Sequence, residues 1–261
     1  MLSTFVLPIG QFGQVQPYLS DFDGSYPLRV SALGQKTNNA TGFDQAWQGI
    51  TAAVRETGAA RMDLFSVVQL ELALPPDPDA EMIGALDRVS GELELRVFCE
   101  APAADAVRTI ALLAQNNTTK HAPLGFKLRT GGIAADAFPT SDEIACVLVA
   151  ATRDAVPIKF TAGLHHPVRQ FRDEAGGKMH GFLNVFGAGV LCAEHGWDEN
   201  LTAQMLEDED PAAFSFDADV FRWRDWAITA DAINGRRRLV TSFGSCSFDE
   251  PRDDLRALRL L

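Results

Sequence analysis

Stretches with helical periodicity alternate along most of the chain with short strand patterns that end in polar residues and glycine or proline. The strands are predicted at 28–33, 65–74, 94–101, 124–130, 157–163 and 239–246. The helices are predicted at 43–57, 79–89, 103–116, 141–154, 180–195 and 225–234. Repeated βα units of about 30 residues favour a parallel sheet. We therefore predict an α/β protein, an irregular (β/α)8 barrel of TIM type that spans residues 1–261 as one domain, with an insertion near 196–224.

Two consecutive strand patterns carry polar residues on a single face. Lys127 and Arg129 alternate with phenylalanine and leucine in the first, and Lys159 and Thr161 alternate with isoleucine and phenylalanine in the second. If the apolar face meets the helices, the polar residues point into the barrel and open at the C-terminal ends of its strands, where barrel active sites lie. An antiparallel sheet with one solvated face would produce the same alternation.

The two lysines are candidates for covalent catalysis. Consecutive βα units normally place their strands side by side, about 4.8 Å apart, so Lys127 and Lys159 are expected to face each other at the same depth. Two neighbouring ammonium groups favour the neutral amine, which attacks a carbonyl carbon to form a Schiff base. Glu71 and Glu100, on similar faces of other strands, can balance this charge or relay protons. A structural network of buried charges is the alternative interpretation.

Three short motifs add a resemblance to this picture. The strand that ends in Glu100, the stretch Lys127-Leu-Arg-Thr-Gly131 and the stretch Lys159-Phe-Thr-Ala-Gly163 resemble the barrel strands of class I aldolases of the deoxyribose-phosphate aldolase kind. The resemblance implies that Lys127 is the Schiff-base lysine and that Lys159 is the second lysine, which lowers its pKa.

The last predicted strand is loosely similar to the phosphate-binding strand of the same family. Its residues Ser242, Gly244 and Ser245 form a small-residue turn whose backbone N–H groups can bind a phosphate or a carboxylate. Such turns are also common at strand ends without any ligand.

Histidines support a different hypothesis. His165 follows a predicted strand end and His180 precedes a predicted helix, and with Glu100 they can bind a divalent metal that activates water. Adjacent residues of a strand point in opposite directions, so at most one of His165 and His166 is expected to serve unless the chain bends there. In the lysine hypothesis, Glu100 and His165 are the candidates for proton transfer and no cofactor is needed.

The composition limits the partners. A net charge of −12 disfavours nucleic acid and anionic membranes, which leaves a small-molecule substrate, with homo-oligomerisation left open. The four cysteines show no CxxC or CxxH spacing and read as reduced thiols. No leader pattern and no long apolar window is present, so a cytoplasmic location is expected.

The hypothesis that combines these observations is a carbon–carbon lyase that acts on a small carbonyl compound, phosphorylated or carboxylated, through a lysine Schiff base. The first alternative is a metal-dependent hydrolase or lyase that uses His165, His180 and a glutamate. The second is a barrel that binds a small ligand without converting it.

Overall fold

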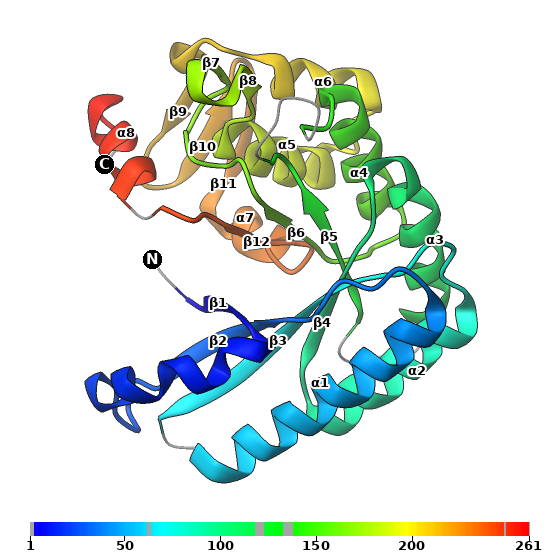
Figure 1. Ribbon diagram of the computed structural model, residues 1–261. Coiled ribbons are helices and arrows are strands. Elements are labelled where there is room, and N and C mark those ends of the chain that lie inside the picture. The colour runs from blue at the N-terminus through cyan, green and yellow to red at the C-terminus, as the bar shows by residue number, and fades with distance from the viewer. Residues whose placement is uncertain (1–2, 62–63, 118–122, 133–137, 248, 261) are drawn as a thin grey trace. The chain divides into compact units, whose positions relative to one another are not determined.

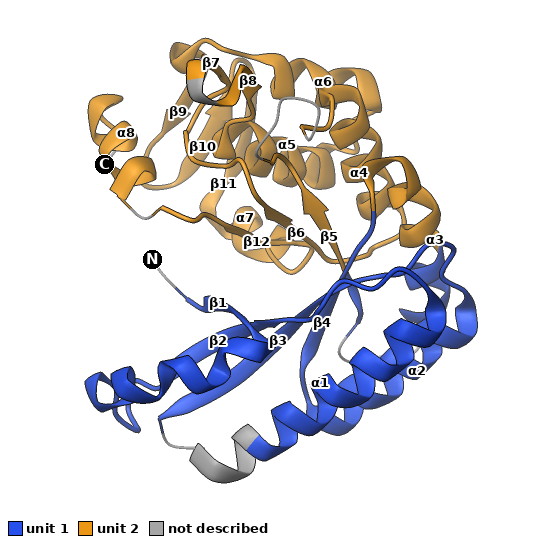
Figure 2. Ribbon diagram, in the orientation of Figure 1, with its two compact units in different colours: residues 1–101, 112–125 blue, residues 102–111, 126–261 orange. Residues whose placement is uncertain are grey.

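The computed structural model describes residues 3–61, 64–117, 123–132, 138–247 and 249–260 (Figure 1). It is a mixed α/β structure whose contacts divide the chain into two compact units (Figure 2). Unit 1 comprises residues 1–101 and 112–125, and unit 2 comprises residues 102–111 and 126–261. Each unit is described by itself. Whether residues 1–261 act as one domain stays a prediction.

Unit 1 contains four parallel strands in the order in which they occur in the sequence. These are β1 (Phe5–Pro8), β2 (Leu28–Leu33), β3 (Phe65–Ala73) and β4 (Arg96–Glu100). The connections are the 3-10 helix η1 (Ile9–Asp21), α1 (Ala40–Arg61) and α2 (Ala80–Leu93). The side chain of Asp79 accepts a hydrogen bond from the Met82 amide at 2.8 Å and so begins α2, because the first amides of a helix have no partner within it.

The core of unit 1 lies on one face of its strands. Leu70 and Leu72 of β3 are almost fully buried, and an added Cβ at Gly34 would meet the side chains of Leu72 and of Ile50 from α1. The helices therefore cover the leucine face of β3, and the opposite face carries Glu71.

Unit 2 contains three parallel strands in the order β5-β6-β12. Their bounds are Gly125–Arg129, Ile158–Thr161 and Val240–Gly244. The helices of this part of the chain are α4 (Ser141–Arg153), α5 (Phe182–His195), α6 (Glu199–Glu207), α7 (Ala230–Arg236) and α8 (Asp249–Ala257). The helix α3 (Ala106–Asn117) follows the short helix η2 (Ala103–Asp105) and has residues in both units. Thr140 and Glu143 form a capping box that begins α4: the Glu143 amide donates to the Thr140 hydroxyl, and the Thr140 amide donates to the Glu143 carboxylate.

The helix α5 packs closely on the ladder of unit 2. An added Cβ at Gly189 would lie 3.0 Å from Val240 of β12, so a glycine lets the helix approach the strand. On the neighbouring strand, the Phe160 ring contacts Phe186 of α5 with ring centroids 5.7 Å apart. The apolar face of β6 and β12 therefore meets a helix.

The segment predicted as an insertion is part of the core of unit 2. It contains α6, which packs on α4 and α5, and most of an antiparallel sheet with the order β11-β10-β9. These strands span Trp226–Thr229, Val220–Trp223 and Phe214–Phe216, and Phe214 follows the short helix η5 (Pro211–Ala213). The buried indole of Trp223 donates a hydrogen bond to the Asp208 carboxylate at 2.9 Å. The prediction of a helix over 225–234 is wrong for its first half, which forms β11 before α7 begins.

A small hairpin completes unit 2. The strands β7 (Gln170–Arg172) and β8 (Gly177–Met179) are antiparallel and are joined through η4 (Asp173–Ala175). Neither strand of this hairpin was predicted.

The fold prediction is confirmed at the level of its class. Parallel strands alternate with helices, and the described residues form a parallel ladder of four strands in unit 1 and one of three strands in unit 2. A closed barrel of eight strands is not shown by these residues. In the same part of the chain, none of the helices is both long enough and apolar enough to cross a membrane.

Candidate functional site

The two predicted lysines lie directly opposite each other. Lys127 of β5 and Lys159 of β6 are paired residues of the parallel ladder, and Arg129 pairs with Thr161. Paired residues project from the same face, so these four side chains share one face of the ladder. Both lysines are 3% exposed, whereas Arg129 is exposed at the strand end. The predicted adjacency of the two strands is confirmed.

The third strand of the ladder extends this polar face. Ser242 pairs with Lys159 and Gly244 pairs with Thr161, after an irregularity between Val240 and Ser242. At this irregularity the Thr241 hydroxyl donates a hydrogen bond to the Ile158 carbonyl at 2.9 Å. Ser242 and Gly244, two of the three predicted anion-binding residues, are therefore in register with Lys159 and Thr161.

Ser245 follows the strand and is exposed. Its hydroxyl oxygen accepts a hydrogen bond from the Ser247 amide at 3.3 Å. Ser245 therefore forms part of a local turn at the strand end. It is also a candidate residue for binding a phosphate or a carboxylate.

The ends of β5 and β6 are held together by backbone contacts. The Thr130 amide donates to the Thr161 carbonyl at 2.8 Å, and the Thr130 hydroxyl donates to the Ala162 carbonyl at 2.6 Å. An added Cβ at Gly131 would lie 2.9 Å from the Cα of Gly163. In the structure, these two glycines approach each other.

The chain turns sharply after β6, and this turn places both adjacent histidines. Ala162 and Gly163 have φ values of 63° and 75°, in the left-handed region, where the alternation of a strand no longer applies. His165 Nδ1 lies 2.9 Å from Glu250 Oε2, and His166 Nδ1 lies 2.6 Å from Asp254 Oδ2. Both rings therefore contact α8. The expectation that at most one of the two histidines takes part in a site applied to a straight strand, whereas the chain bends at Ala162 and Gly163.

His165 has a second partner. Its Nε2 lies 3.4 Å from the sulfur of Cys246, a cysteine with an exposed side chain that follows β12. The hydrogen bond from His165 is the largest cause that lowers the pKa of Glu250, and the Ser247 hydroxyl acts in the same direction against the effect of desolvation. Cys246 and Glu250 were missed by the sequence analysis. The residues next to Cys246 and Glu250 in the sequence carry no sign that these two side chains meet a histidine more than 80 residues earlier.

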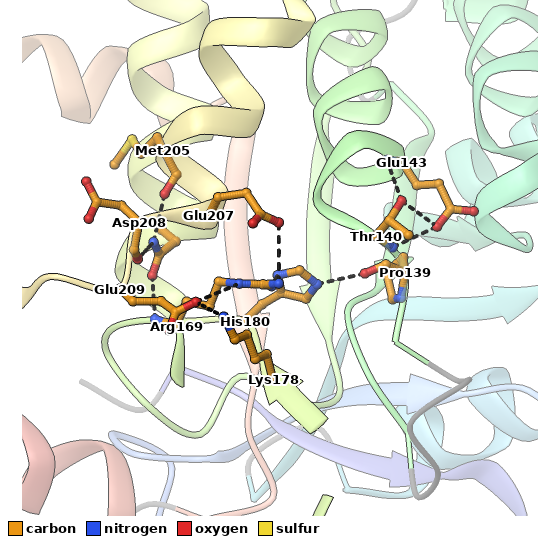
Figure 3. A network of polar contacts seen from close by, with 11 residues as sticks. Pro139, Thr140, Glu143, Arg169, Lys178, His180, Met205, Glu207, Asp208 and Glu209 are labelled. Carbon is orange, nitrogen blue, oxygen red and sulfur yellow. Dashed lines mark hydrogen bonds and ion pairs between the residues drawn. The ribbon is translucent and has the colours of Figure 1, made fainter. Parts of the chain in front are cut away.

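His180 occupies a different environment, shown in Figure 3. Its Nε2 lies 2.7 Å from the Pro139 carbonyl oxygen, and its Nδ1 lies 3.1 Å from the guanidinium of Arg169. A carbonyl only accepts hydrogen bonds, so Nε2 carries the proton and Nδ1 of the neutral ring accepts from Arg169. Burial is the largest cause and lowers the pKa of His180. The hydrogen bond with the Pro139 carbonyl is the second largest effect and raises this pKa, the charge of Arg169 lowers it, and the charge of Glu207 raises it.

The residues around His180 connect β7, β8, α5 and α6. Arg169 forms ion pairs with Glu207 at 3.3 Å and with Glu209 at 3.9 Å (Figure 3). The fully buried Asn184 accepts a hydrogen bond from the Arg169 amide at 2.8 Å and donates to the carbonyls of Met205 and Asp208 at 2.7 and 2.8 Å. These contacts assign His180 a structural role, which explains both of its ring nitrogens without a metal.

The two predicted glutamates belong to unit 1. Glu71 is buried and accepts hydrogen bonds from the Ser31 hydroxyl at 2.5 Å and from the Gln69 amide at 3.4 Å. Glu100 ends β4, is half-buried, and its backbone carbonyl accepts from the Leu74 amide at 2.9 Å. Among the described residues, no group of three or more histidine, cysteine, aspartate or glutamate side chains is arranged to hold a metal ion. The metal hypothesis therefore has no geometric support in this part of the chain.

The site defines this chain as an α/β protein with polar side chains gathered at the carboxyl ends of a parallel ladder, where ligands of such folds bind. Comparison with models of protein families, with curated proteins and with solved structures found no match. The function is therefore inferred from the site's own geometry.

Proposed function

We propose that the protein is a carbon–carbon lyase of the class I aldolase type, which forms a Schiff base between Lys127 and a small carbonyl compound. The observation that carries this proposal is the direct pairing of Lys127 with Lys159 at buried positions of adjacent strands. An amine attacks a carbonyl only in its neutral form. Lys159, which pairs with Lys127 on the adjacent strand, is the second lysine of the proposed site.

The reaction follows from the chemistry of an imine. The amine of Lys127 adds to the carbonyl carbon and water leaves, which forms an iminium ion. The bond between the α and β carbons then breaks, its electron pair moves into the iminium to give an enamine, and the β-hydroxyl proton passes to a base as the aldehyde leaves. Protonation of the enamine and addition of water release the second product and restore the amine. His165, on the loop that follows β6, is the candidate base that the sequence analysis named.

The same ladder offers groups that suit a substrate anion. Arg129 is exposed at the strand end in the same row as Thr161 and Gly244. A guanidinium binds phosphate or carboxylate through two parallel hydrogen bonds, and backbone N–H groups near Gly244 and Ser245 can add to this. A phosphorylated or carboxylated carbonyl compound is therefore the proposed substrate.

The finer predictions from the sequence belong to this proposal. Schiff-base aldolases of the kind that the motifs resemble are TIM-type barrels with the reacting lysine on a strand, so the irregular (β/α)8 barrel is proposed along with the reaction. A cytoplasmic location, which would keep the thiols reduced, is proposed with it.

Borohydride trapping tests the proposal. The protein is incubated with acetaldehyde, pyruvate or dihydroxyacetone phosphate, reduced with sodium borohydride and analysed by peptide mass spectrometry. We expect a reduced adduct on Lys127 that is absent from Lys127→Met and slower to form in Lys159→Met, because the methionine side chain keeps the length and loses the amine.

The matched control is Lys178→Met. Lys178 is an exposed lysine of the same unit, paired with Glu209, and its loss should leave trapping unchanged. Circular dichroism shows whether each variant is folded. Absence of an adduct on folded protein across the panel, or labelling of Lys178 as fast as of Lys127, would overturn the proposal.

A further inference from the structure

We propose that Cys246, His165 and Glu250 form a second, thiol-based site that hydrolyses a small acyl ester or thioester through an acyl-cysteine. The inference shares His165 with the proposed lysine reaction but uses a different nucleophilic atom and a different covalent intermediate, so each proposal can fail without the other. It rests on the contacts of His165, which connect an exposed thiol with a carboxylate.

The Glu250 carboxylate determines which ring nitrogen of His165 carries the proton, and therefore that the nitrogen facing the thiol has a free lone pair. Glu250 has a lowered pKa and is ionised near neutral pH, so it only accepts hydrogen bonds. The proton of the neutral ring is therefore on Nδ1, 2.9 Å from Glu250 Oε2, and Nε2 is left to accept the thiol proton over 3.4 Å. Cys246, His165 and Glu250 therefore have the spatial order of nucleophile, base and base-orienting group that is found in catalytic triads.

Three separate segments are brought together to build this arrangement. His165 follows β6, Cys246 follows β12, and Glu250 lies in the first turn of α8. The same helix also holds His166 through Asp254, one turn further along. Because both histidines are bound by one helix, the position of the base is set by two contacts.

Cys246 differs from the other three cysteines in its surroundings. Cys99 is buried, and burial raises its pKa to about 12. Burial also raises the pKa of Cys192, and at Cys146 burial and Glu199 raise it together. Cys246 is instead exposed and has a histidine, not a carboxylate, beside its sulfur. Of the four thiols it is the one placed for nucleophilic attack.

The reaction balances without an oxidant or a cofactor. His165 Nε2 takes the thiol proton while the sulfur electron pair forms a bond to the acyl carbon. The bond between the acyl carbon and the alcohol oxygen, or the thiol sulfur of a thioester, then breaks, and the leaving group takes the proton from His165. Water next attacks the acyl-cysteine as His165 accepts its proton, the carbon–sulfur bond breaks, and the carboxylic acid is released. The sulfur regains its proton from His165.

Acyl transfer to the protein tests the inference. p-Nitrophenyl acetate and an acetyl thioester of N-acetylcysteamine serve as probes, with release of the leaving group measured over time and acid-quenched protein digested to locate the acetyl group. We expect acetyl on Cys246 and a rate that falls on the order of 100-fold in His165→Gln, which keeps a polar side chain but removes the base. Glu250→Gln should give a smaller fall, because only the orientation of the base is lost.

Control variants separate this site from general thiol reactivity and from the lysine site. Cys146→Ser should leave the rate unchanged, while Cys246→Ser should abolish acetylation yet keep the carbonyl adduct on Lys127. Failure of the lysine proposal would remove only that adduct. The inference is overturned if folded protein carries no acetyl on Cys246, or if the acetylation rate of Cys246 is the same in His165→Gln as in the unchanged chain.

Discussion

Two histidines of unit 2 differ in the partners of their ring nitrogens. His165 lies between a carboxylate and an exposed thiol, whereas His180 is buried between a carbonyl and a guanidinium. From the sequence, both were candidate metal ligands, and His165 was also a candidate for proton transfer. The partner of one ring nitrogen determines the role of the other. In His165 the second nitrogen presents a lone pair to a thiol, and in His180 it accepts a hydrogen bond from the half-buried Arg169. Three measurements test this difference between the two histidines.

The largest effect on stability is expected from a substitution in the network of hydrogen bonds around His180. Asn184→Ala removes a buried side chain that satisfies the Arg169 amide and two carbonyls of the segment after α6. Unpaired buried groups should lower the free energy of unfolding by about 4 kcal/mol. Urea unfolding followed by tryptophan fluorescence measures this. Asn200→Ala, at an exposed position of α6, should stay within about 0.5 kcal/mol, and equal losses in both variants would show that the network contributes nothing.

A smaller effect is expected from pH. Burial lowers the pKa of His180 from its usual 6.5. As the pH falls, this residue therefore binds a proton in the unfolded chain at a higher pH than in the folded chain. Stability from this group is therefore complete above about pH 6.5 and decreases as the pH falls toward the lowered value. Free energies of unfolding measured at several pH values between about 7.5 and 5, on both sides of the usual pKa of histidine, test the direction of this change in stability. His180→Gln should have a shallower slope, and an unchanged slope would contradict this account.

The smallest effect on stability is expected at His165. Its ring is partly exposed and its ion-pair partner Glu250 is about half exposed, so His165→Ala should lower the free energy of unfolding by less than about 1 kcal/mol. The alkylation rate of Cys246 by iodoacetamide should nevertheless fall in the same variant, because the base beside the sulfur is gone. A loss of several kcal/mol would instead place His165 in the structural class of His180.

The alternation of side chains made the lysine face predictable. The period of two in β5 and β6 fixes which residues share a face, and consecutive βα units place the strands next to each other, so the pairing of Lys127 with Lys159 follows from local rules. The helix start at Thr140 was equally local. The positions of all six predicted strands were correct to within two residues at each end for the same reason.

The rest depended on contacts that have no local signal. The thiol and the carboxylate reach His165 because the chain turns at Ala162 and Gly163, and a period of two says nothing beyond the end of a strand. The strand β11 was taken for part of a helix because its four residues are shorter than the window in which periodicity can be measured. Its pairing with β10 decides its structure instead.

The helix α8 has a consequence for the order in which the chain is synthesised. Glu250 and Asp254 leave the ribosome 85 and 88 residues after the histidines that they contact. At ordinary elongation rates this delay is roughly 4 to 18 seconds. During that interval a growing chain can already contain β5, β6 and their lysines, while the ring of His165 has no carboxylate to orient it. The thiol emerges only four residues before its carboxylate, so nucleophile, base and orienting group can assemble only after residue 250 has been synthesised.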